Sequence, residues 1–99
     1  MTQINVSLLS TDPKADPQQF QVEVVSEDNS KTAHRVTLHQ DLYVRITGGL
    51  KSAEELVKAS FEFLLEREPK ESILPAFDLA EIQKYFPEFE QAIALQITK

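Results

Sequence analysis

The sequence contains no cysteine, no tryptophan and only two glycines. Without cysteine the chain has no disulfide, no thiolate metal ligand and no thiol nucleophile. No stretch approaches the ~20 consecutive apolar residues that a transmembrane helix needs. The N-terminus also lacks the basic and apolar regions of a signal peptide. These absences favour the cytoplasm as the expected location.

Positive charge is scarce as well. Lysine and arginine together number 10 against 16 aspartates and glutamates, which gives a formal net charge of −6 at pH 7. A protein that binds nucleic acid without sequence preference needs clustered basic residues to displace the counterions of the phosphates. No basic run is present, and the acidic field repels anionic surfaces. We therefore expect neither duplex nucleic acid nor a membrane among the partners.

The chain has 99 residues, of which 41% are hydrophobic, and this length is typical of one compact domain. Residues 20–99 are predicted to form a single α+β domain. Residues 1–19 are expected to be a flexible segment, because residues 10–17 hold two Asp-Pro steps and no large apolar side chain. The alternation of Ile4, Val6 and Leu8 leaves room for an additional edge strand over residues 4–9.

Three segments with alternating apolar side chains predict a three-stranded antiparallel meander, or four strands with residues 4–9. They are residues 20–26, 32–38 and 42–47. In the predicted register Phe20 lies opposite Leu38, and Leu38 opposite Leu42. Apolar side chains and His34 then share one face, as a half-buried antiparallel sheet requires.

Helices are predicted to follow the meander. Ser52 and Glu55 have the spacing of a capping box, which starts one long helix that ends near Glu68. Its apolar side chains span about twice the stripe that covers one sheet. A second cap at Asp78 begins a short helix that stops at Pro87. For the last segment, residues 90–98, the spacing fits either a helix or a strand.

The motifs that would indicate catalysis or cofactor binding are missing, so we expect no enzyme, no cofactor and no metal. The glycine spacing before Lys51 and Ser52 does not fit a nucleotide-binding P-loop. A weaker anion site at Gly48, Gly49, Lys51 and Ser52 remains an alternative, because helix N-termini attract anions. His34 is predicted to be a hydrogen-bonded core residue. His39 with Asp41 is a poor metal site, since two ligands in a loop lack a third.

Two arginines are the candidate partner contacts. In the predicted register Arg35 and Arg45 face each other on the outer side of the sheet, with Thr37 and Tyr43 next to them. Like charges on opposed strands are destabilising. Either Glu23 bridges the two guanidinium groups, or they form a paired site for a carboxylate or phosphate of a partner.

The amino-acid sequence resembles that of a group of small uncharacterised bacterial proteins in four segments, residues 45–49, 60–74, 77–79 and 85–90. These segments read Arg-Ile-Thr-Gly-Gly, Ser-Phe-Glu-Phe-Leu-Leu-Glu-Arg-Glu-Pro-Lys-Glu-Ser-Ile-Leu, Phe-Asp-Leu and Tyr-Phe-Pro-Glu-Phe-Glu. No established activity comes with that group. The resemblance implies a bacterial cytoplasmic protein and transfers no functional residue.

The predicted function is a non-catalytic protein-interaction or accessory module with an unknown protein partner. The alternative is a small-anion or nucleotide-binding domain that uses the Gly48-Gly49 turn and the following helix N-terminus. A homodimer is also predicted, because the C-terminal half holds more apolar surface than a small chain readily buries. The phenylalanines behind this prediction are Phe61, Phe63, Phe86 and Phe89.

Overall fold

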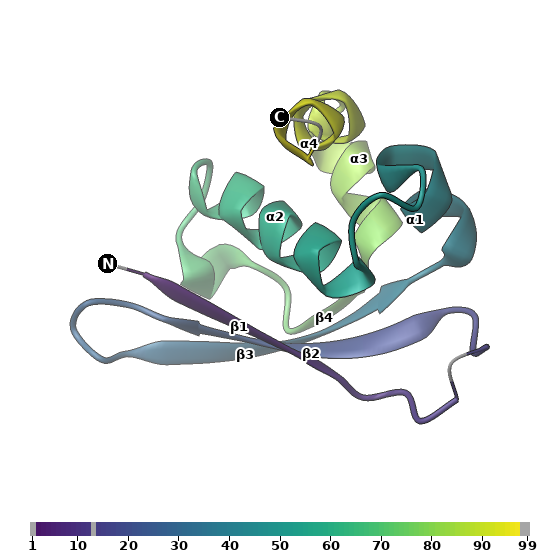
Figure 1. The fold of residues 1–99 in the computed structure, drawn as a ribbon. Helices are drawn as coiled ribbons and strands as arrows, with labels where there is room; N and C mark the ends of the chain where they lie inside the picture. Colours follow the sequence, from purple (N-terminus) through teal and green to yellow (C-terminus); the bar gives the residue numbers. More distant parts are fainter. Residues whose placement is uncertain (1, 13, 98–99) are drawn as a thin grey trace.

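The computed structural model describes residues 2–12 and 14–97 and shows one sheet with helices stacked on one of its faces (Figure 1). Met1, Pro13, Thr98 and Lys99, which belong to the segments predicted above, lie outside the described residues. The strands are β1 (Gln3–Leu8), β2 (Gln18–Val25), β3 (Lys31–Leu38) and β4 (Ala76–Asp78). The α-helices are α1 (Gln40–Thr47), α2 (Ala53–Leu65), α3 (Ile82–Tyr85) and α4 (Phe89–Ile97), with short 3₁₀ turns η1 (Lys70–Ser72) and η2 (Leu79–Glu81).

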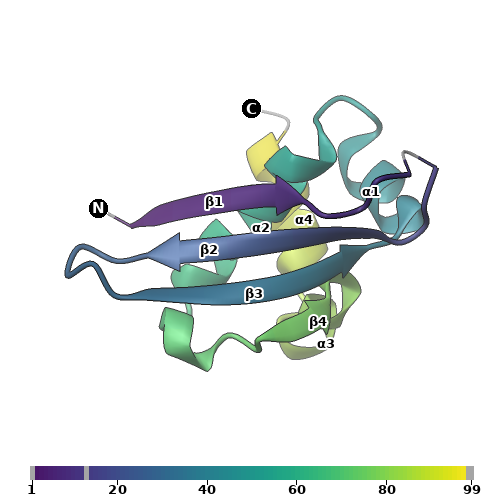
Figure 2. The ribbon, with the colours of Figure 1, turned by 90° about the horizontal axis from the view of Figure 1, so that it is seen from below.

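The sheet is mixed, so the predicted α+β class is confirmed while the purely antiparallel meander is wrong. The strand order is β1-β2-β3-β4, visible from below in Figure 2. β1–β2 and β2–β3 are antiparallel, whereas β3 and β4 run parallel. The edge strand expected over residues 4–9 is present as β1. Over residues 2–12 and 14–97 the helical layer contains four α-helices rather than one long helix with short companions.

The β2–β3 register differs by two residues from the prediction, with Phe20 opposite Val36 instead of Leu38. The reason is the turn, which begins earlier than expected. Asn29 donates its N–H to the carbonyl of Ser26 at 3.0 Å and has a left-handed φ of 68°, the geometry of a three-residue hairpin loop. Because the shift is even, every side chain keeps its predicted face.

The predicted third strand, residues 42–47, is wrong, because this segment is the helix α1. Leu42 and Ile46 are buried while Val44 between them is exposed, so the apolar side chains follow helical spacing. Asp41 lies in the first turn and Arg45 in the last, where their charges favour the helix dipole. Gly48 ends the helix at a left-handed φ of 61°, a conformation that glycine adopts without strain.

The start of α2 is as predicted. The hydroxyl of Ser52 accepts the N–H of Glu55 at 3.1 Å, and the Glu55 carboxylate accepts the N–H of Ser52 at 3.3 Å. The helix ends at Leu65, three residues before the expected Glu68. Its wide apolar surface is buried between the sheet and the other helices, where Leu56, Val57 and Phe61 have no exposed surface.

The C-terminal segment completes this core. Within residues 90–97 the chain is helical, so the helical interpretation of this segment is confirmed there. The side chains of Phe63 and Phe89 meet edge to face, with ring centroids 5.3 Å apart. Phe61, Phe63 and Phe89 are buried, whereas Phe86 is partly buried and packs against the core. Among the described residues no helix combines the length and apolar character needed to cross a membrane.

Candidate functional site: an apolar groove with an acidic rim

The structure separates the two arginines that were predicted to face each other. Arg35 lies on β3, beside Ala76 of β4, and it is exposed. Arg45 lies on α1 and forms a two-point ion pair with Glu90 of α4, at 2.8 Å and 3.0 Å. Hydrogen bonding and charge from Glu90 raise the pKa of the Arg45 guanidinium above its usual value. The prediction that Arg35 and Arg45 oppose each other is therefore wrong, because residues 40–47 form a helix instead of a strand.

Thr37 and Tyr43, the other two predicted partner contacts, hold elements of the chain together. The Thr37 hydroxyl donates to the Asp78 carboxylate at 2.8 Å, which links β3 to the end of β4. The Tyr43 hydroxyl donates to the carbonyl of Lys51 at 2.5 Å and ties α1 to the turn before α2. Thr37 lies two positions from Arg35 on the outer face of β3, whereas Tyr43 and Arg45 belong to α1. Partner contact by any of the four stays a prediction.

The anion site predicted as an alternative lies at a helix N-terminus that already has a carboxylate. Gly48 and Gly49 form the α1–α2 turn, both with positive φ. Glu55 accepts from both the N–H and the hydroxyl of Ser52, and the Lys51 ammonium lies 4.0 Å from its second oxygen. The N–H and hydroxyl of Ser52, which an external phosphate would use, are thus already bonded to a carboxylate of the chain.

We expect inorganic phosphate to leave the amide signals of residues 48–53 unchanged for this reason. The measurement is an NMR titration at ~0.15 M salt. The matched control is Glu55→Gln, which removes the competing charge and keeps the capping geometry. Saturable shifts at these residues in the unaltered chain would contradict this expectation and support the alternative function.

Both histidines take part in hydrogen bonding or ion pairing within the chain. His34 is buried, as predicted, with Nδ1 2.8 Å from the carbonyl of Leu74 and Nε2 2.7 Å from the Thr32 hydroxyl. His39 is the residue before α1, and its Nε2 lies 2.9 Å from an Asp78 oxygen while Nδ1 lies 3.6 Å from Asp16. Within residues 2–12 and 14–97, no group of three His, Cys, Asp or Glu side chains could hold a metal ion.

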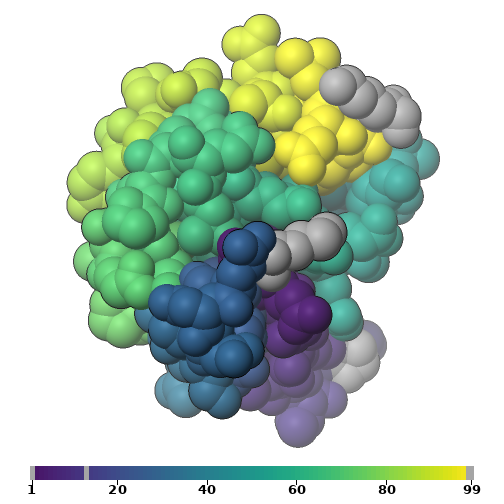
Figure 3. All heavy atoms as spheres, turned by 90° about the vertical axis from the view of Figure 1, so that its left-hand side faces the viewer, coloured from purple at the N-terminus to yellow at the C-terminus, as the bar shows by residue number. Residues whose placement is uncertain are grey.

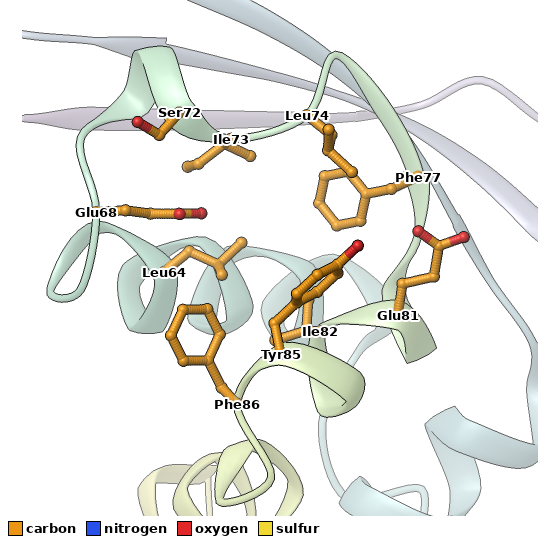
Figure 4. A pocket seen from close by; sticks show the side chains of 10 residues that line it. All are labelled: Leu64, Glu68, Ser72, Ile73, Leu74, Phe77, Glu81, Ile82, Tyr85 and Phe86. Carbon is orange, nitrogen blue, oxygen red and sulfur yellow. The ribbon is translucent and has the colours of Figure 1, made fainter.

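A groove of about 270 Å³ opens between the end of α2, the 68–74 segment, β4 and α3 (Figure 4). Its walls are mostly apolar. The residues that line it are Leu64, Glu68, Ser72, Ile73, Leu74, Phe77, Glu81, Ile82, Tyr85 and Phe86. The groove was not predicted from the sequence. The apolar residues between Pro69 and Pro87 indicated only that this segment packs against another part of the chain.

The floor of the groove is the surface of the hydrophobic core. Leu64, Ile73 and Ile82 are each at least 95% buried. Two lining aromatics pack against core rings: the centroid of Phe77 lies 6.0 Å from that of Phe61 in a tilted arrangement, and the centroid of Phe86 lies 5.9 Å from that of Phe63, edge to face. These ring contacts join both aromatics of the groove wall to the core.

The mouth of the groove combines exposed apolar side chains with negative charge. Leu74 is 48% exposed and Tyr85 69% exposed, so both offer contact area to an incoming molecule. Glu68 and Glu81 lie at opposite sides of the opening (Figure 4). Within the described part of the chain neither carboxylate has a basic partner, and none of the ten lining residues is basic. The rim is therefore acidic.

No protein-family description, no curated protein and no solved structure matches this chain. The resemblance to small bacterial proteins stays a prediction.

Proposed function

We propose that this protein is a non-catalytic interaction module whose groove binds a peptide segment of a partner protein. The observation that carries the proposal is the groove itself, which joins a buried apolar floor to the exposed side chains of Leu74 and Tyr85. Its volume is slightly below the ~300–1,000 Å³ of small-molecule pockets, and its lining offers no basic or imidazole group. A space of this kind suits one or two apolar side chains of a peptide.

The charge of the rim indicates what lies beside those apolar side chains. Glu68 and Glu81 form no ion pair within the described residues, and the whole chain carries a net charge of −6. Complementary charge around an interface speeds association and selects the partner. The expected ligand is therefore a segment with leucine, isoleucine or phenylalanine anchors flanked by lysine or arginine. A cytoplasmic bacterial setting for this interaction stays part of the proposal.

Selection from a random 12-residue peptide display library tests the proposal. We expect the selected peptides to share an apolar anchor with basic flanks. Leu74→Ser should weaken the best of them about 10-fold, or ~1.4 kcal/mol, because the proposal makes Leu74 one of the few residues that carry most of the binding energy. The matched control is Leu50→Ser, which changes a leucine that is 78% exposed and lies outside the groove.

Charge is tested on the same peptides. Glu68→Gln with Glu81→Gln should weaken binding and reduce its dependence on salt, since exposed charges are screened beyond ~10 Å at 0.1 M. Peptides that bind the Leu74→Ser and Leu50→Ser variants equally well, or that carry acidic flanks, would contradict the proposal.

A further inference from the structure

The edge strand β1 has no partner on its outer side within the described residues, since it pairs only with β2. The opposite edge is different, because β4 is only three residues long. Figure 3 shows β1, in purple, at the surface beside the β2–β3 hairpin tip, in dark blue. Natural proteins usually protect such edges with charges, prolines or bulges. Residues 3–9 contain no charged residue and no proline.

The backbone groups at this open edge can be identified from one hydrogen bond. Leu9 donates its N–H to the carbonyl of Gln19 at 2.8 Å, in continuation of the β1–β2 register. In an antiparallel ladder, residues that bond to the neighbouring strand alternate with residues that face away from it. The N–H and carbonyl groups of Ile4, Val6 and Leu8 therefore face outward.

We propose that two copies of this chain pair through β1, antiparallel, around a two-fold axis at Val6. In this register Val6 faces the partner's Val6, and Ile4 faces the partner's Leu8. All three outward-facing residues of each strand then exchange backbone hydrogen bonds. The result is one continuous sheet of eight strands with the helices of both copies on the same face.

Side chains support the same register. Leu8 is 47% exposed, and Ile4 of the second copy would cover it on the core face of the sheet. On the outer face, Asn5 lies opposite the partner's Ser7, an uncharged pair that can hydrogen-bond. A strand without charge meets no repulsion from its own copy, whereas directly opposed like charges are destabilising. An isologous contact of this kind closes after two copies.

The contact is small, because one strand of six residues contributes most of it. Interfaces at the low end of the size range are weak, so we expect dissociation constants of about 10–100 μM. Sedimentation equilibrium at ~20 to 500 μM protein and ~0.15 M salt covers this range. The expected result is a mass that rises from 11.2 kDa toward twice that value. A constant mass of 11.2 kDa up to 500 μM overturns the proposal.

Two double variants test the register. Asn5→Lys with Ser7→Lys places lysine opposite lysine twice across the axis, so we expect at least ~10-fold weaker association. Asn5→Lys with Ser7→Glu places each lysine opposite the partner's glutamate and should associate at least as strongly as the unaltered chain. Both variants share the Asn5→Lys change, which lies opposite Glu23 of β2 within the chain. Equal association of the two variants contradicts the Val6-centred register.

Val6→Pro tests the backbone bonds directly. The Val6 N–H faces outward, so proline removes it without breaking the β1–β2 ladder. We expect this variant to keep its circular-dichroism spectrum and to remain monomeric. Persistent dimers of a folded Val6→Pro protein would overturn pairing through β1. Groove peptides should bind all of these variants alike, which separates failure here from failure of the proposed function.

Discussion

Phe61→Ala is expected to lower the free energy of unfolding by about 3–5 kcal/mol, the usual cost of removing a buried phenylalanine ring. The ring has no exposed surface, and its centroid lies 5.4 Å from that of His34 and 6.0 Å from that of Phe77. It thus joins α2 to β3 and β4 at the same time. For a domain of this size the loss corresponds to a fall in melting temperature of more than ~12 °C.

Urea and thermal denaturation, followed by circular dichroism, measure this effect. The matched control is Val44→Ala on α1, because the Val44 side chain is half exposed. This change should alter the free energy of unfolding by no more than about 0.5 kcal/mol. A loss below about 1.5 kcal/mol for Phe61→Ala, well under the usual range, would show that the ring is not enclosed as the structure has it.

His34→Leu is expected to lower the free energy of unfolding by about 1–3 kcal/mol, because it removes the two hydrogen bonds of a buried ring, to the Leu74 carbonyl and the Thr32 hydroxyl. The Leu74 carbonyl can only accept, so the His34 ring must donate its Nδ1 proton there. In the neutral ring Nε2 then accepts the Thr32 hydroxyl. The bond to Leu74 holds the strand β3 to the segment that leads into β4.

Two measurements check the role of His34. Denaturation should rank His34→Leu as more damaging than Thr32→Val, since the threonine is only partly buried. Long-range ¹H–¹⁵N NMR correlations of the ring should show the proton on Nδ1. A neutral ring protonated on Nε2 instead would contradict the hydrogen-bond assignment. Because Leu74 forms part of the groove wall, His34→Leu should also weaken binding of the selected peptides.

Local patterns in the sequence predict β1, β2, β3 and the start of α2, because each depends on neighbouring residues alone. Period-two alternation gives the strands and their faces, and the Ser52–Glu55 spacing gives the cap. The same approach fails for α1, since Leu42, Val44 and Ile46 alternate as in a strand, while Leu42 and Ile46 by themselves also fit helical spacing. The deciding signals were Asp41, Arg45 and Gly48, which together mark the two ends of a helix.

The remaining features depend on contacts between distant residues. β4 is three residues long, and nothing in Ala76, Phe77 and Asp78 indicates a parallel pairing with β3 across two helices. The groove could not be predicted for the same reason, since α2 and segments on both sides of β4 together form its floor and walls. The arginine site failed because the strand assumed for Arg45 does not exist.

The parallel pairing of β3 with β4 has a consequence for the order in which the molecule assembles. The hairpin of β2 and β3 closes a short loop, whereas the Thr37–Asp78 bond joins residues 41 positions apart. Closing the longer loop loses more chain entropy, and such contacts generally form later in folding. The groove includes residues of β4 and of the segments on both sides of it, so it forms only once β4 has paired with β3. A bound peptide would therefore stabilise the complete fold over states in which this pairing is missing. Peptide binding would therefore be limited to molecules in which β3 and β4 are already paired.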